Sequence, residues 1–314
     1  MNEQPKRLYR SWMFVPGDRQ EMIDKALTLP ADAIMMDIED SVVPAEKDNA
    51  RRRIAASLDT VCDRLKREPD YRTPARFVRV NAVGTTGFID DTKAVMRHGI
   101  EGLVVPKVET VAQIRIVEDE LGRSEVAHHM PGGSVKLLIA IESPIGLFNA
   151  FQIASSSPRI VGLMFGAEDF TRAMNLPMRR EGEAVDMIYA RSHIATAAAA
   201  AHVQAVDAVW VDLNDRDGMR RFALQSRRLG MSGISIIHPN QIADANAAFT
   251  PTAEEIDYAQ AVVNAFEDAR AHGHGAVAFR GQLLDYPIVD RARQTLALAK
   301  TLGAGRKTEM HDGR

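Results

Sequence analysis

The segment from Lys136 to Gly166, KLLIAIESPIGLFNAFQIASSSPRIVGLMFG, contains the pattern that decides the fold. It begins and ends with short runs of apolar, partly β-branched residues, Lys136–Glu142 and Ile160–Gly166. The residues between the two runs are numerous enough to form a helix. Near-continuous apolar strands that alternate with helices are typical of a parallel sheet covered on both faces.

The same alternation extends over most of the chain. Six further runs read as strands: Trp12–Pro16, Ala33–Ile38, Arg76–Asn81, Gly102–Lys107, Ala205–Val211 and Gly233–His238. Eight strand–helix units in roughly 250 residues are the size of a closed (β/α)8 TIM barrel. A doubly wound open sheet is the competing α/β fold, but the first strand is not followed by a Gly-x-Gly-x-x-Gly turn. We therefore predict a catalytic barrel over residues 9–250.

Two connecting segments show helix signals. Thr86–His98 is amphipathic and precedes Gly99, which can adopt a left-handed cap. Asp215–Leu229 follows a cap signal at Asn214 and precedes Gly230. We expect one helix from each segment.

The chain continues beyond the eighth unit. Thr252–Arg270 starts with a capping box, and Pro287–Leu302 reads as a final helix. We predict a helical extension over 251–302 that carries a lid segment, and a disordered tail over 303–314.

The composition favours a cytoplasmic protein. The chain has 314 residues, 46% of them hydrophobic, a net charge of -3 and one cysteine, Cys62. A single cysteine permits no internal disulfide framework, which fits a reducing compartment. Neither a secretory signal nor an apolar stretch of membrane-spanning length is apparent. The nearly balanced charge argues against electrostatic binding of nucleic acid or membrane surfaces.

Charged side chains follow most of the predicted strands, where barrel enzymes place their active sites. They are Asp37, Glu39, Asp40, Arg79, Lys107, Glu142, Glu168, Asp169, Asp212 and His238. Buried strands have no structural need for so many charges, and an unpaired buried charge costs several kcal/mol. We expect these residues to form a site at the mouth of the barrel.

Glu142 and Asp169 follow neighbouring strands, so their carboxylates are expected to converge. Two carboxylates without a cysteine or histidine partner suit Mg²⁺, or alternatively Mn²⁺, completed by water and substrate oxygens. Each carboxylate alone could equally cap a helix. Their position on adjacent strands favours the metal site.

The two cations of this group allow more than one interpretation. Arg79 can bind a substrate carboxylate bidentately, and it can also pair with Asp37. Lys107 could form a Schiff base, as in a metal-free aldolase, although such an enzyme would not need the carboxylate pair. His238 could contact the substrate or simply hydrogen-bond the turn at Pro239.

The sequence resembles a known family. Its motifs are VPGDRQEMIDKAL, MDIEDSV followed by Lys47, VRVN, VPKVE, IAIESPIGL, FGAEDF, IHPNQ and FRGQLLDYPIVDRA, in this order over residues 9–300. Together they resemble the citrate lyase β-subunit-like branch of the HpcH/HpaI aldolase superfamily, which includes malyl-CoA and citramalyl-CoA lyases.

The resemblance implies a pyruvate-utilising barrel that forms homotrimers or hexamers, with Mg²⁺ at the barrel mouth. Glu142 and Asp169 match the family's metal ligands, and Arg79 matches the arginine that holds the substrate carboxylate. Asp285 in GQLLDYP matches an acid/base aspartate that reaches a neighbouring subunit. Gln282 stands where the family often has lysine or serine, so a CoA-phosphate contact at this position is not expected.

The function expected from these features is Mg²⁺-dependent cleavage of a 3-hydroxy-3-carboxy acyl-CoA into a 2-oxo acid and an acyl-CoA. Glu39 and Asp40 would orient metal-bound water or Arg79, and Lys107, Asp37, Arg19 and His238 are further candidates for substrate or CoA contacts. Three alternatives stay open. They are a citrate lyase β-subunit that uses an acyl-carrier-protein thioester, a CoA-independent class II pyruvate aldolase, and a non-catalytic barrel that binds CoA thioesters.

Overall fold

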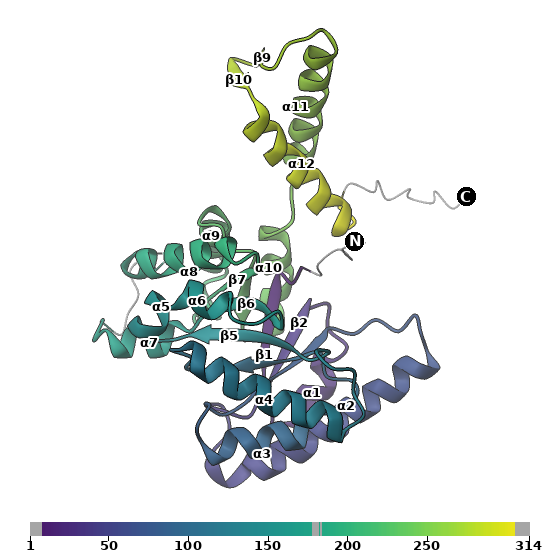
Figure 1. The fold of residues 1–314 in the computed structure, drawn as a ribbon, viewed down its shortest axis with the longest axis vertical. Coiled ribbons are helices and arrows are strands. Elements are labelled where there is room, and N and C mark those ends of the chain that lie inside the picture. The colour runs from purple at the N-terminus through teal and green to yellow at the C-terminus, as the bar shows by residue number, and fades with distance from the viewer. Residues whose placement is uncertain (1–7, 178–181, 183, 305–314) are drawn as a thin grey trace. The chain divides into compact units, whose positions relative to one another are not determined.

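A computed structural model describes residues 8–177, 182 and 184–304 (Figure 1). Contacts divide the described residues into two compact units, 8–246 and 247–304. The predicted tail lies outside the described residues from position 305 onward. The assignment of a catalytic role to the first unit and a lid role to the second stays a prediction.

The first unit is a closed barrel of eight parallel strands in sequential order, which confirms the predicted (β/α)8 fold. The strands are β1 (Ser11–Pro16), β2 (Ala33–Asp37), β3 (Ala75–Arg79), β4 (Gly102–Val105), β5 (Lys136–Ile141), β6 (Ile160–Phe165), β7 (Gln204–Asp207) and β8 (Gly233–Ile236). β1 pairs with both β2 and β8, and this double pairing closes the barrel.

Helices follow the strands and lie outside the barrel (Figure 1). They are α1 (Gln20–Ala26), α2 (Lys47–Arg67), α3 (Thr86–Val95), α4 (Val111–Ala127), α5 (Pro144–Phe148), α6 (Ala150–Ala154), α7 (Ala167–Ala173), α8 (Ile188–Ala200), α9 (Arg216–Arg228) and α10 (Ile242–Ala248). Short 3-10 turns, η1 (Pro44–Glu46), η2 (Val185–Met187) and η3 (Pro239–Gln241), complete the connections.

Side chains from several strands fill the barrel interior. Trp12 contacts Tyr9 and Phe77 edge-to-face, with ring centroids 4.9 and 4.8 Å apart. Met164 belongs to the same buried cluster, and Phe14 packs against it. The interior is therefore a packed core, and it supports the residues at the carboxyl ends of the strands.

Every predicted strand except the first extends beyond the observed strand end, and the fourth and seventh show why. The seventh ends at Asp207 rather than Val211, because Trp210 turns out of strand geometry: its indole donates to the carbonyl of Asp215, and its own carbonyl accepts from Gln241. The fourth ends at Val105 rather than Lys107, since Pro106 has no N–H and Lys107 is left-handed, with φ 55°.

Two helix signals also need correction. α3 ends at Val95, and Gly99 lies in the following turn, where a β-carbon would come within 2.5 Å of the Leu58 carbonyl oxygen. α9 is capped by Asp215, whose carboxylate accepts from the N–H of Gly218, and not by Asn214.

The second unit is a pair of helices, α11 (Ala253–Ala271) and α12 (Tyr286–Thr301), joined by a short hairpin of β9 (Val277–Phe279) and β10 (Gln282–Leu284). The capping box of Thr252 and Glu255 is present as predicted. The hairpin was not predicted; its turn residues, Arg280 and Gly281, both have positive φ. Among the described residues, none of the helices has the length and apolarity that a membrane span requires.

One buried ion pair joins α4 to the strands. Glu125 accepts two hydrogen bonds from Arg159, at 2.6 and 2.7 Å, and one each from the N–H groups of Gly133 and Val135. Burial alone would raise the pKa of Glu125, but these donors outweigh it and lower the pKa to about 2. The carboxylate therefore stabilises the fold in its ionised form.

We predict a loss of stability in acid that depends on Glu125. The unfolded carboxyl titrates near 4.5, so its contribution is complete above that pH and disappears as the pH falls toward 2. Glu125→Ala should cost about 3 kcal/mol at pH 7, measured by urea unfolding. Asp59→Ala is the control, because Asp59 pairs with Arg97 at an exposed position; its cost should stay below about 0.5 kcal/mol. Equal losses in both variants would contradict this assignment.

Candidate active site

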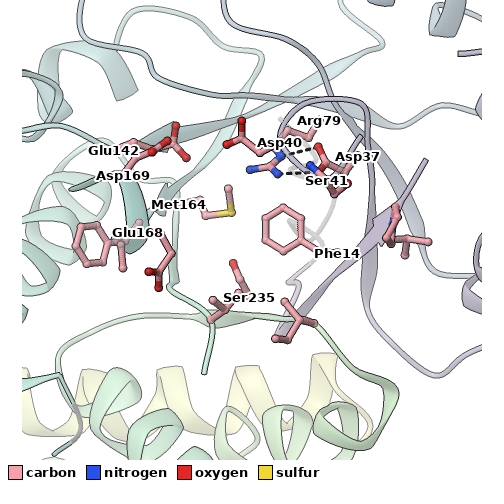
Figure 2. A pocket seen from close by; sticks show the side chains of 17 residues that line it. Phe14, Asp37, Asp40, Ser41, Arg79, Glu142, Met164, Glu168, Asp169 and Ser235 are labelled. Atoms are coloured by element: carbon pink, nitrogen blue, oxygen red, sulfur yellow. Dashed lines mark hydrogen bonds and ion pairs between the residues drawn. The ribbon is translucent and has the colours of Figure 1, made fainter. Parts of the chain in front are cut away.

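A cavity of about 430 Å³ opens at the carboxyl ends of the strands (Figure 2). Its charged lining comprises one guanidinium and five carboxylates, from Arg79, Asp37, Asp40, Glu142, Glu168 and Asp169. Its apolar lining includes Phe14, Met164, Phe165, Val209 and Ile237. The cavity therefore combines a strongly acidic rim with apolar walls.

Arg79 and Asp37 form the central ion pair of the site. β2 and β3 place them directly opposite each other, and Nε and Nη2 of Arg79 each donate to one carboxylate oxygen at 2.7 Å. Burial opposes the charge on Asp37, but Arg79 outweighs it and holds the pKa below its ordinary value. The guanidinium also lies over the ring of Phe14, 4.8 Å from its centroid.

Glu39 connects Arg79 to Lys107. Its carboxylate lies 3.2 Å from Nη1 of Arg79 and 2.5 Å from Nζ of Lys107. Burial raises the pKa of Glu39, although the two cations partly offset that effect. Glu39 and Lys107 contact residues that line the cavity and do not line it themselves.

Lys107 is surrounded by acidic groups. Its Nζ lies 3.5 Å from Asp40 and 3.6 Å from Asp169, in addition to its contact with Glu39. Despite partial burial, these carboxylates raise the pKa of Lys107 above its ordinary value. A Schiff-base nucleophile requires a neutral amine with a lowered pKa, so the surroundings of Lys107 argue against that chemistry.

Glu142 is a buried carboxyl of the cavity whose pKa is raised. Its Oε2 accepts from the backbone N–H of Lys107 at 2.8 Å. Burial, together with the negative charges of Glu39 and Asp169, raises the pKa of Glu142 to about 7, although Arg79 opposes this rise. The side chain lies against Gly166, where a β-carbon would come within 2.4 Å of its Oε1 atom. Gly166 therefore creates the space that Glu142 occupies.

Asp169 lies in the first turn of α7, directly after β6, and pairs with Arg172 at 2.7 Å. Its charge acts on Glu142, and the two carboxylates face the same part of the cavity (Figure 2). Within the described ranges, histidine, cysteine and acidic residues form no cluster of three or more that could hold a metal ion. Mg²⁺ commonly uses only one or two protein carboxylates, with water and substrate oxygens, so this oxygen-only pair suits it.

Three predicted site residues lie elsewhere. Arg19 precedes α1, with its side chain 68% exposed, and does not line the cavity. His238 accepts a hydrogen bond from the N–H of Asn240 through Nδ1 and so caps η3. Asp285 belongs to the second unit and caps α12 by accepting from the N–H of Ile288. Contacts of these residues with substrate stay predictions.

Part of the cavity lining was not predicted from the sequence. Phe14, Met164 and Ser235 lie inside predicted strands, where they read as ordinary core residues. The available signal was strand alternation, which would have directed them toward the barrel interior. Ser235 is distinctive because its hydroxyl is buried and has no hydrogen-bond partner within the described structure.

We predict that the Asp37–Arg79 pair also supports the fold. Asp37→Asn should leave a buried guanidinium without its balancing charge and cost about 3 kcal/mol in urea unfolding. Asp40→Asn is the matched control, since Asp40 is 59% exposed and forms its ion pair, among the described residues, with Lys107 at 3.5 Å; its effect should stay within about 0.5 kcal/mol. If both variants unfold like the parent protein, the pair has no structural role.

Comparison with known proteins gives consistent matches. The family model described as HpcH/HpaI aldolase/citrate lyase matches residues 10–239. Citrate lyase subunit beta of Escherichia coli K12 is 38% identical over 303 residues, covering 96% of this chain and 97% of that protein. The mitochondrial citramalyl-CoA lyase of Mus musculus is 30% identical, covering 93% of this chain and 86% of that protein.

A solved structure is similar over nearly the whole chain. The CitE protein of Mycobacterium tuberculosis, in complex with magnesium, acetoacetate and coenzyme A, superimposes with a TM-score of 0.75 at 28% identity. The match covers 94% of this chain and 99% of that structure.

Proposed function

Because the chain belongs to the HpcH/HpaI aldolase/citrate lyase family, we propose that it is a Mg²⁺-dependent carbon–carbon lyase. Its substrate would be a 3-hydroxy-3-carboxy acyl thioester of the malyl-CoA or citramalyl-CoA type. The products would be a 2-oxo acid and an acyl-CoA. The observation that carries this proposal is the placement of Glu142 and Asp169 beside Arg79 in one cavity.

Glu142 and Asp169 would hold the metal. A bound Mg²⁺ would supply Lewis-acid chemistry that lowers the pKa of the substrate hydroxyl. The acidic rim supports this assignment because burial, together with repulsion from Glu39 and Asp169, raises the pKa of Glu142, and a bound cation would favour its ionised form.

Arg79 would bind and orient the substrate carboxylate. Two of its five N–H groups donate to Asp37, and Nη1 forms an ion pair with Glu39, which leaves donors on both Nη atoms. Asp37 and Glu39 also fix the plane of the guanidinium. Lys107 and Asp40 would complete the charge balance around the reacting groups.

Asp285 would protonate the thioester carbon. Loss of the hydroxyl proton allows the carbon–carbon bond to break, and its electron pair passes to the thioester enolate. One proton leaves the hydroxyl and one reaches the enolate, so no oxidant or reductant is required. We propose, as the family resemblance implies, that Asp285 acts in the cavity of a neighbouring subunit of a trimer or hexamer.

A second candidate is the β-subunit of a citrate lyase complex, which would use an acyl-carrier-protein thioester. The 38% identity to the E. coli subunit supports this candidate, as the 30% identity to the citramalyl-CoA lyase supports the first one. Gln282 also favours it, since its side chain accepts from Tyr258 and supplies no cation for a CoA phosphate. Parallel assays with CoA and carrier-protein thioesters, with detection of glyoxylate, pyruvate and oxaloacetate, separate the two candidates.

The remaining alternatives have less support. A CoA-independent class II aldolase would be expected to have a histidine base near the first strands, and the sequence has none before His98. A non-catalytic binding barrel would bind thioesters without releasing a 2-oxo acid. The same assays, run beside calorimetric titration with CoA thioesters, test both.

We predict that metal binding depends on the Glu142–Gly166 contact. Glu142→Ala and Asp169→Ala should abolish Mg²⁺-dependent release of a 2-oxo acid while the proteins stay folded. Gly166→Ala should weaken Mg²⁺ binding at least about 10-fold in calorimetric titration, because its methyl group would displace the Glu142 carboxylate. Gly122→Ala is the control, since its β-carbon would contact nothing within 4 Å. Full turnover in EDTA would exclude the metal role.

We predict that Asp285 acts across a subunit boundary. Mixed oligomers of Asp285→Ala and Arg79→Ala chains should recover part of the activity that each variant lacks alone, because some cavities would combine an intact barrel with an intact Asp285. Mixed oligomers of Glu142→Ala and Arg79→Ala are the control and should stay inactive, since both changes affect the same cavity. Absence of recovery in verified mixed oligomers would place Asp285 within its own subunit's site or outside the reaction.

A further inference from the structure

Asp91 is a buried acid that the proposed function does not use. It lies in α3, its side chain is 0% exposed, and it does not line the cavity. Its Oδ1 accepts a hydrogen bond from Nε of Arg51 at 2.7 Å. Its Oδ2 accepts two from Asn81, one from the backbone N–H at 2.7 Å and one from Nδ2 at 2.6 Å. A buried ion pair is often no more stabilising than apolar packing, so the conformation that these hydrogen bonds impose is the more informative feature.

Asp91 fixes the orientation of the Asn81 amide. A carboxylate paired with arginine accepts hydrogen bonds and donates none, so the amide must turn its Nδ2 donor toward Asp91. The amide oxygen is thereby left for Lys47, whose Nζ donates to Oδ1 of Asn81. Gly87 leaves room for this arrangement, since a β-carbon there would lie 3.0 Å from Cβ and Cγ of Asn81.

Lys47 links Asn81 to the loop that follows β2. It is the first residue of α2, and its Nζ also donates to the backbone carbonyl of Glu39 at 3.3 Å. The N–H of Glu39 donates to Oδ1 of Asp37 at 2.9 Å. Both backbone polar groups of Glu39 are therefore held, one by the end of β2 and the other, through Lys47 and Asn81, by the acid in α3.

The position of the Glu39 backbone matters because its side chain joins the two cations of the site. The carboxylate lies 3.2 Å from Nη1 of Arg79 and 2.5 Å from Nζ of Lys107. Asp37 binds Nε and Nη2 of Arg79, and Glu39 supplies the contact to Nη1. Any displacement of this backbone moves the Glu39 carboxylate away from one cation or the other.

We propose that Asp91 is a positioning residue for the active site. It acts through Asn81 and Lys47 on the backbone of Glu39. The result is a fixed carboxylate beside Arg79, which binds the substrate carboxylate under the proposed function, and the inference rests on that function. Asp91 itself, in a helix outside the barrel, touches no reacting group.

A purely structural role would have a different signature. Loss of a structural ion pair lowers the free energy of unfolding and speeds hydrogen exchange throughout the elements that the pair joins. Loss of a positioning contact instead affects the loop that carries Glu39 and the binding of substrate by Arg79. The two roles are therefore separated by where exchange changes and by which kinetic constant changes.

Hydrogen exchange, measured by mass spectrometry on peptides that cover residues 38–42, tests the positioning without substrate. In Lys47→Met, the amides of Glu39 and Ser41, which donate to Asp37, should exchange at least about 10-fold faster than in the parent protein. Peptides from β3 and α3 should keep their parent rates, because Asp91 still pairs with its partners. Asp91→Asn should accelerate the same loop, since a neutral amide no longer compels Asn81 to turn its oxygen to Lys47. If Asp91→Asn fails to fold, Lys47→Met still decides.

Lys66→Met is the matched control. Lys66 also belongs to α2, but it is 68% exposed and pairs with Asp63 at 3.2 Å. This variant should leave the exchange of residues 38–42 and both kinetic constants as in the parent.

Kinetics, measured with the thioester that the parallel assays identify as substrate, test the link to Arg79. Lys47→Met should raise KM at least about 10-fold and change kcat less than about 3-fold, because Arg79 holds the carboxylate in the ground state and the transition state alike. In a Glu39→Gln background, Lys47→Met should raise KM by less than about 2-fold more, since its effect acts through Glu39.

Each outcome decides one question. Parent-like exchange of residues 38–42 in Lys47→Met would overturn the inference, and so would exchange that rises equally in β3 and α3, which shows a structural role. Independent effects of Lys47→Met and Glu39→Gln on KM would also overturn it. Parent protein that releases no 2-oxo acid in Mg²⁺ would overturn the proposed function, whereas the exchange pattern would still decide whether Asp91 and Lys47 hold Glu39.

Discussion

The site depends on the ion pair between Asp37 and Arg79. Register places these residues opposite each other at the ends of β2 and β3, and the bidentate contact holds both strand ends together. Arg79 in turn holds Glu39, and Glu39 holds Lys107. The backbone of Lys107 then fixes Glu142. A continuous chain of polar contacts therefore runs from β2 to β5, so the position of each carboxylate depends on the one before it.

Lys107 shows how backbone geometry contributes to this chain. Its left-handed conformation is unusual for a residue with a side chain. In this conformation its N–H donates to Glu142 while its ammonium group reaches Glu39 and Asp169. One residue thus contacts carboxylates from three strand–helix units, and the local strain is the cost of that arrangement.

The sequence predicted the barrel because apolar runs and helical gaps are local patterns. It also predicted the charged residues at the strand ends, since polar side chains interrupt those runs. It did not predict the end of β7, which depends on hydrogen bonds of Trp210 to distant residues, or the hairpin before Asp285. Ser235 was not predicted as a site residue for a similar reason. A serine inside a strand becomes distinctive only when the three-dimensional structure leaves its hydroxyl without a hydrogen-bond partner among the described residues.

The crowding of carboxylates around Glu142 has a consequence for the lifetime of the protein. Burial of Glu142, together with the charges of Glu39 and Asp169, opposes its ionised form, and a cation bound at this carboxyl would relieve that opposition. Any cation or ligand that binds only the folded form shifts the population away from unfolded chains. Proteases attack those unfolded chains, so supply of the bound species would slow degradation and raise the abundance of the protein. Scarcity of the bound species would speed degradation and lower the abundance of the protein.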